Sequence, residues 1–117
     1  MKIDSRGVDG ITILDMQGRI TLGEDTVAFR RAISGLVADG RKMVLLNLHE
    51  VPYIDSSGIG ELVAAFTKVR DSGGELKLLN LSPKIRTLLE ITKLYSVFDV
   101  QSDENAAIRS FAVGAPS

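Results

Sequence analysis

The hydrophobic pattern of the sequence predicts an α/β fold: a mixed, mostly parallel sheet of four to five strands with about four helices, in the order ββαβαβαβα. Three observations lead to this prediction. Two β-prone runs flank an Asp-Gly pair near the start, nearly unbroken apolar runs occupy residues 43–48 and 76–81, and segments with helical spacing lie between the runs. Unbroken apolar runs are typical of strands covered on both faces, as in parallel sheets.

The first half of the chain is predicted to form three strands and one helix: strands at residues 2–7, 11–16 and 43–48, and a helix over about residues 22–38. The first two strands are expected to form a hairpin, because Asp9-Gly10 between β-prone runs favours a tight turn. Thr21 and Glu24 have the spacing of a capping box at the start of the helix. The inward face of this helix is expected to hold Val27, Phe29, Ala32, Ile33, Leu36 and Val37.

The second half is predicted to continue the alternation: a helix at residues 57–71, strand 76–81, helix 83–91, a short strand at 97–100 and a final helix. Apolar residues recur at helical spacing from Ile59 to Val69. Ser82 and Ser102 are expected to cap the last two helices. Right-handed crossovers would place the loops after residues 48 and 81 at the carboxyl edge of the sheet, where open α/β sheets hold their sites.

Size and composition fit one domain over residues 1–117, with a core at about 3–112 and a tail at 113–117 that is expected to fray. With a net charge of -1, the protein has no positive potential that would attract nucleic acid or an anionic membrane. The sequence contains no cysteine, which excludes thiolate catalysis and Cys-ligated metals. It contains one histidine. No cofactor or metal is expected. Without a signal core or an apolar run of membrane-spanning length, we expect a cytoplasmic protein.

The candidate catalytic groups each have a simpler explanation. His49 beside Glu50 could act as a base, but the sequence offers no second histidine or cysteine to complete a constellation. The segment Gly35 to Lys42 resembles half of a phosphate-binding P-loop, yet it ends a helix instead of beginning one. The carboxylates can be explained as helix-end or exposed residues; they are Glu24, Asp25, Asp55 and Glu61. These features predict a protein that is not an enzyme.

The stretch from Val51 to Gly60 joins an apolar strand to a helix, and we expect the function to lie there. One side chain suffices to cap a helix, yet Asp55, Ser56 and Ser57 stand in a row at this helix start. A phosphoryl group on either serine would add about -1.5 to -2 charge, which the free amides and the dipole of a helix start favour. A partner covering this edge would be repelled by that charge beside Asp55. Such a partner is expected to pack on Tyr53, Ile54 and Ile59.

The run Leu46-Asn47-Leu48 followed by Tyr53-Ile54-Asp55-Ser56-Ser57-Gly58-Ile59-Gly60 resembles the signature of the STAS domain of bacterial anti-sigma-factor antagonists. The order of strands and helices agrees with that family over about residues 3–112. The resemblance implies that Ser56 is the phosphoacceptor, and Asp55, Ser57 and Gly58 match the flanking positions of the motif. At Thr21 the sequence departs from the family, whose members often carry an acid there.

The resemblance implies a partner-switching role in the regulation of transcription. The dephosphorylated antagonist would bind an anti-sigma factor that is also a serine kinase, and this binding would release the sigma factor. Phosphorylation of Ser56 would end the binding, and a serine phosphatase would reset the protein. An alternative is a non-phosphorylated accessory STAS subunit of a stress complex or a lipid-transport system. The resemblance does not indicate an oligomeric state.

Overall fold

The computed structural model describes residues 1–111. The strands are β1 (Lys2–Val8), β2 (Ile11–Gln17), β3 (Met43–Glu50), β4 (Glu75–Leu79) and β5 (Asp99–Gln101), and the helices are α1 (Glu24–Ala38), α2 (Ser56–Asp71), α3 (Pro83–Ile91) and α4 (Glu104–Ser110). The five strands lie in the order β1-β2-β3-β4-β5, with β1 antiparallel to β2 and all other neighbours parallel. The predicted α/β fold and element order are confirmed.

The opening hairpin forms as expected. Asp9 and Gly10 have φ values of 52° and 82°. Positive φ at both central residues is the requirement of a type I′ turn, which matches the twist of the two strands that it joins.

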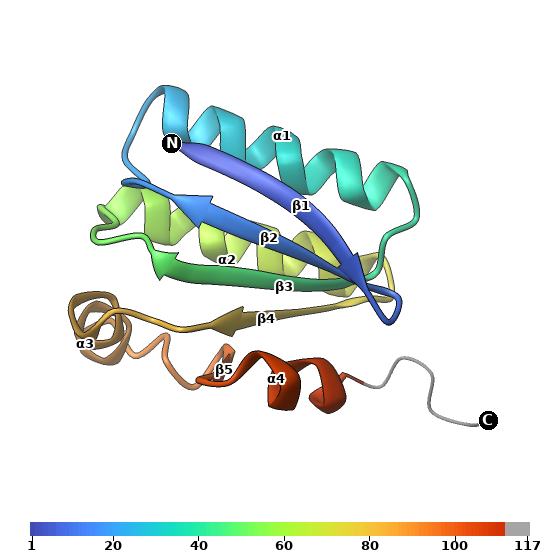
Figure 1. Cartoon of the computed structure of the whole chain (residues 1–117). Helices are drawn as coiled ribbons and strands as arrows, with labels where there is room; N and C mark the ends of the chain where they lie inside the picture. The colour runs from blue at the N-terminus through green and yellow to red at the C-terminus, as the bar shows by residue number, and fades with distance from the viewer. Residues whose placement is uncertain (112–117) are drawn as a thin grey trace.

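Helices cover both faces of the sheet. The larger apolar cluster joins α1, α2 and α3 to one face and includes Phe29, Leu46 and Leu62, all fully buried. The smaller cluster packs Ala107 and Phe111, in and just after α4, against the other face. Figure 1 shows α1 and α2 running side by side along the sheet, with α4 beside β5. None of the helices within residues 1–111 is long and apolar enough to cross a membrane.

Two charged clusters, centred on Arg6 and Lys77, connect α4 to the sheet. Arg6 on β1 holds Asp15 of β2 (Nε to Oδ2, 2.7 Å) and Glu104 of α4 (Nη2 to Oε1, 2.5 Å), and its hydrogen bonds lower the pKa of both carboxyls. Lys77 on β4 has a side chain that is only 8% exposed. Its ammonium group donates to the backbone oxygen of Ser110 at 2.8 Å and pairs with a carboxylate of β5.

Two predicted helix caps are wrong, and one residue of the predicted inward face is exposed. The N-cap of α1 is Gly23, whose amide donates to Thr26 Oγ1, and the hydroxyl of Thr21 instead donates to Asp25 Oδ2 at 2.9 Å. Asp103, not Ser102, caps α4. Val27 is 40% exposed. The tail predicted to fray, residues 113–117, lies outside the described part of the chain.

Candidate functional site

Two loops meet at the start of α2. The chain that follows β2 and the chain that follows β3 run parallel for a short distance, with an isolated bridge between Ile20 and Ile54. The amide of Ile20 donates to the carbonyl of Tyr53 at 3.1 Å, and the amide of Asp55 donates to the carbonyl of Ile20 at 3.2 Å. Both loops leave the sheet at the carboxyl ends of parallel strands. For the loop after β3, this agrees with the prediction. The loop before α1 therefore forms one wall of the site at the start of α2.

Asp55 is the residue that joins the two loops. One carboxylate oxygen accepts the amide of Gly58 at 2.8 Å and so caps α2, while the other accepts the amide of Leu22 at 3.0 Å. The hydrogen bonds from Gly58 and Leu22 lower the pKa of Asp55. The carboxylate therefore stays charged near neutral pH and holds the loop before α1 against the start of α2.

Neither serine hydroxyl helps to cap α2. Ser56 is exposed and Ser57 is half-buried. Within residues 1–111, neither hydroxyl forms a hydrogen bond, because Asp55 already occupies the capping position. Both hydroxyls are therefore free of a structural hydrogen-bonding role, and that of Ser56 is open to the surface.

The structure corrects two expectations for this stretch: that a partner packs on Ile54, and that the amides at the start of α2 are free to receive a phosphoryl group. Ile54 is 1% exposed and belongs to the main core, so its side chain is not available to a partner. The amide of Gly58 is already occupied by Asp55, so it is not a free donor for a phosphoryl group. A Cβ atom at Gly58 would lie 2.4 Å from the carbonyl oxygen of Ile20. Gly58 is thus required for the close approach of the two loops.

The exposed face of the site contains basic residues that the sequence analysis missed. Arg19, Pro52, Tyr53 and Lys84 line a hollow of about 360 Å³, and Lys84 Nζ lies 4.9 Å from the centre of the Tyr53 ring. Tyr53 and Ile59 are half-buried, so each presents part of its surface. One signal was available in the sequence: a lysine in the first turn of a helix opposes the helix dipole, which favours an explanation other than helix stability.

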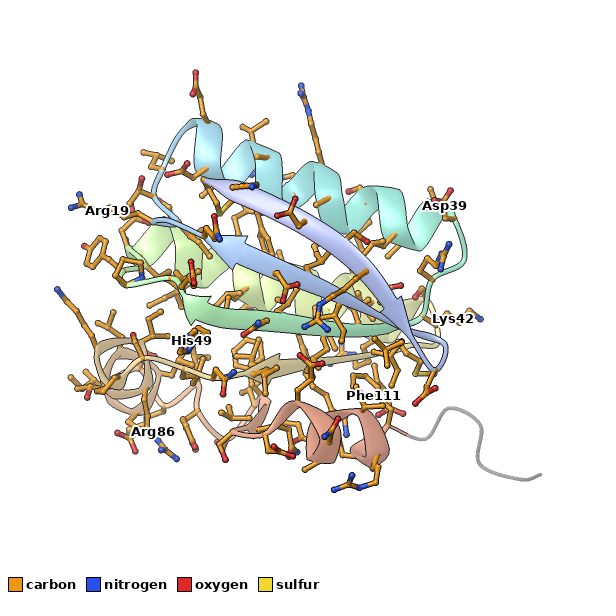
Figure 2. The ribbon with its side chains drawn as sticks, viewed as in Figure 1. Arg19, Asp39, Lys42, His49, Arg86 and Phe111 are labelled. Carbon is orange, nitrogen blue, oxygen red and sulfur yellow. The ribbon has the colours of Figure 1, made fainter. Side chains whose placement is uncertain are left out.

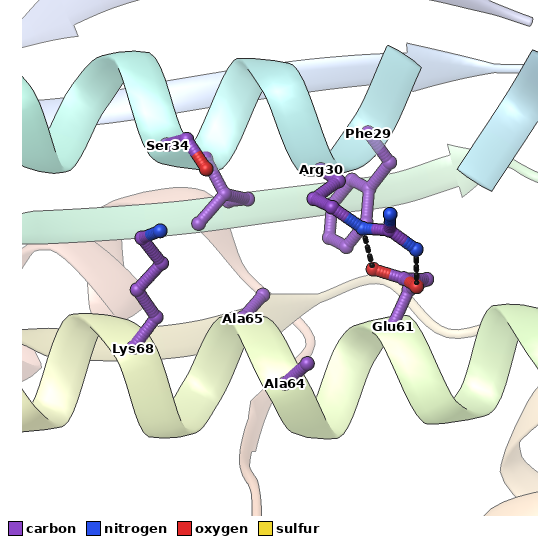
Figure 3. A pocket seen from close by; sticks show the side chains of 8 residues that line it. Phe29, Arg30, Ser34, Glu61, Ala64, Ala65 and Lys68 are labelled. Carbon is purple, nitrogen blue, oxygen red and sulfur yellow. Dashed lines mark hydrogen bonds and ion pairs between the residues drawn. The ribbon is translucent and has the colours of Figure 1, made fainter. Parts of the chain in front are cut away.

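The catalytic candidates Glu61 and His49 do not form part of a catalytic site. Glu61 on α2 pairs with Arg30 on α1 (Oε2 to Nη2, 2.6 Å) beside a hollow of about 230 Å³ between the two helices (Figure 3). In the described residues, the ring of His49 has no hydrogen-bonding partner, and no group of three or more His, Asp or Glu side chains could hold a metal ion. Glu61 is therefore explained by its contact between helices.

Comparisons with known proteins agree with the sequence motif. A family model described as STAS domain matches residues 2–107. The chain is 28% identical over 116 residues to BtrV of Bordetella bronchiseptica, and the match covers 99% of both proteins. It is 37% identical over 62 residues to the anti-sigma-B factor antagonist of Bacillus subtilis, which is 53% of this chain and 57% of that protein.

Solved structures share the fold. The crystal structure of tm1081 from Thermotoga maritima has a TM-score of 0.87 at 22% identity, covering 93% of each chain. The Bacillus cell fate determinant SpoIIAA in its phosphorylated form has a TM-score of 0.72 at 20% identity, covering 92% of this chain and 97% of that one. At these identities the similarity concerns the arrangement of strands and helices.

Proposed function

Because the chain belongs to the STAS domain family, we propose that it is an anti-sigma factor antagonist whose binding to its partner is switched off by phosphorylation of Ser56. The partner is an anti-sigma factor with serine kinase activity in the cytoplasm, and a serine phosphatase restores the unmodified protein. The chain itself acts as a binding module and not as an enzyme. The anti-sigma-B factor antagonist of Bacillus subtilis, a relative over half of the chain, supports this proposal.

The observation that carries the proposal is the state of Ser56. Its side chain is exposed at the first residue of a 16-residue helix, and Asp55 performs the capping. A kinase can therefore reach the hydroxyl without unfolding the helix. The added phosphate would lie at the positive end of the helix dipole, which compensates part of its charge.

The same geometry explains how one phosphate would end binding. Tyr53, Ile59 and Leu22 present apolar surface around Ser56, and Leu22 is 77% exposed. A partner that covers this surface excludes water from it. A phosphate of about -2 charge next to the charged Asp55 would then be removed from water together with that carboxylate, and the complex would be destabilised. The fold itself would tolerate the group.

Phosphorylation can be tested with an anti-sigma factor of the serine-kinase type from the same organism. Incubation with that kinase and ATP is expected to add one phosphate, measured by intact-protein mass spectrometry. Ser56→Ala is expected to abolish the mass increase. Ser57→Ala is the matched control, because it removes a neighbouring hydroxyl that also forms no hydrogen bond, and it is expected to retain the modification.

Binding is tested with a phosphate mimic. Ser56→Asp is expected to weaken the complex with the kinase about tenfold or more, measured by isothermal titration calorimetry. Its thermal midpoint is expected to stay within about 2 °C of the unmodified protein, as for a surface substitution. An unmodified protein after the kinase assay would exclude the switch and favour the accessory subunit. Equal binding by Ser56→Asp would exclude the electrostatic mechanism.

A further inference from the structure

A larger polar cavity lies away from Ser56, at the carboxyl ends of β3, β4 and β5. Its volume is about 450 Å³. It is bounded by His49 at the end of β3, Asn80 after β4 and Gln101 at the end of β5, with α3 as a further wall. Figure 2 shows His49 at this end of the sheet and Arg86 on the neighbouring helix α3. Cavities at the carboxyl ends of parallel strands are the usual ligand sites of open α/β sheets.

Arg86 is the one arginine or lysine that lines this cavity, and among the described residues no aspartate or glutamate lines it. Within residues 1–111, Arg86 forms no ion pair with a carboxylate. Its guanidinium instead donates to the hydroxyl of Tyr95 and lies 5.0 Å from the centre of that ring. The aromatic ring holds the cation in place and leaves its charge uncompensated.

The walls of the cavity are well ordered by backbone contacts. Asn80 adopts a left-handed conformation with φ of 59°, and its amide donates to the carbonyl of Gln101 at 2.9 Å. This turn brings the start of α3 beside the end of β5. The hydroxyl of Ser82 accepts the amide of Ile85 and caps α3, whereas the hydroxyl of Ser102 has no partner in the described residues. Ser102 therefore offers a free donor at the mouth of the cavity.

Apolar surface accompanies the polar groups. Leu81 and Val100 are half-buried and line the cavity together with Pro83. A ligand site of this volume typically combines an apolar lining with a few polar groups that fix orientation. The combination here is a fixed cation, a free hydroxyl and an apolar wall.

We propose that this cavity binds a small organic anion, with a phosphate or carboxylate group at Arg86 and an apolar body against Leu81 and Val100. The chemistry of the site suits both anionic groups, because a guanidinium donates two parallel hydrogen bonds to either. The proposal does not depend on the phosphorylation of Ser56, which lies on a different helix.

The proposal can be tested by titrating the ¹⁵N-labelled full chain with phenyl phosphate and, separately, with benzoate, followed by NMR. Saturable shifts are expected at the amides of Ser82, Arg86 and Ser102 for at least one probe, and the tighter probe identifies the preferred anion. Inorganic phosphate lacks the apolar ring and phenol lacks the anionic group. Each is expected to bind about tenfold more weakly than the tighter probe.

Matched variants locate the site. Arg86→Gln is expected to weaken binding of the tighter probe about tenfold, because it removes a charge-assisted contact. Arg109→Gln, at an exposed arginine of α4, makes the same change in charge and is expected to leave the affinity unchanged. His49→Gln lies on a separate element and provides a second test should Arg86→Gln fold poorly.

Three results would overturn the proposal. The first is the absence of saturable shifts for both probes up to about 10 mM, which is weaker than expected for a specific site. The second is an equal affinity of the Arg86→Gln, His49→Gln and unmodified proteins. The third is a set of shifts confined to the amides of Ser56 and Ser57, which would place the anion at the start of α2.

Discussion

Substitution of Gly58 by alanine tests whether the two loops of the site require a residue without a side chain. The added Cβ would lie 2.4 Å from the carbonyl oxygen of Ile20 and 2.5 Å from Cγ2 of Ile54. Real Cβ atoms do not approach other atoms so closely, so the loop before α1 would have to move away. The hydrogen bond from the amide of Asp55 to the carbonyl of Ile20, now 3.2 Å, would lengthen with it.

The expected change in the free energy of unfolding combines one stabilising and two destabilising contributions. Alanine is favoured over glycine inside a helix by up to about 1 kcal/mol. Overpacking a core costs about 1 to 3 kcal/mol. Weakening one hydrogen bond costs about 1 kcal/mol. Gly58→Ala is therefore expected to lower the free energy of unfolding by about 1 to 3 kcal/mol, which for a domain of this size lowers the thermal midpoint by about 4 °C per kcal/mol.

Gly60→Ala is the matched control on the same helix. A Cβ at Gly60 meets no atom within 4 Å, so only the gain in helix propensity remains. Urea unfolding followed by circular dichroism is expected to show a less stable Gly58→Ala and a Gly60→Ala that equals or exceeds the unmodified protein. If the two variants were equally stable, the close packing of the loops would not be a requirement of the fold.

Three further predictions concern the charged groups. Asp55→Ala is expected to speed hydrogen exchange at the amide of Leu22, measured by NMR; unchanged exchange would mean that the carboxylate does not hold the loop. Arg6 lowers the pKa of Asp15 and of Glu104 in the folded protein. These ion pairs therefore stabilise the fold at a pH above the ordinary pKa values of 3.8 and 4.5, and the stabilisation is lost as the pH falls through the lowered pKa values of the folded state. Arg6→Gln should therefore reduce the loss of stability on acidification, and an unaltered pH profile of urea unfolding would contradict this. Lys77→Ala is expected to destabilise the protein by about 1 to 3 kcal/mol, whereas the exposed Lys42→Ala should have little effect; equal urea midpoints would refute the anchoring of α4.

The errors at the helix starts have a common physical cause. Thr21 and Glu24 have the spacing of a capping box, yet α1 begins after Gly23. The chain from Ile20 to Leu22 is bonded to the loop after β3, so it does not enter the helix where the local signal places the helix start. The strand β5 similarly continues to Gln101, which pairs with Leu79, and the cap of α4 moves to Asp103. In both places contacts between distant segments override the local signal.

The sequence alone determined the element order, the opening hairpin and the row of capping and hydroxyl residues at the start of α2, because periodicity, turn preference and capping act over a few neighbouring residues. Only the tertiary structure decided which of those residues caps the helix. It also decided that Ile54 is buried, that Arg19 and Lys84 flank Tyr53, and that Arg86 and His49 share a cavity. These outcomes depend on segments that are far apart in the chain and meet only when the sheet has formed.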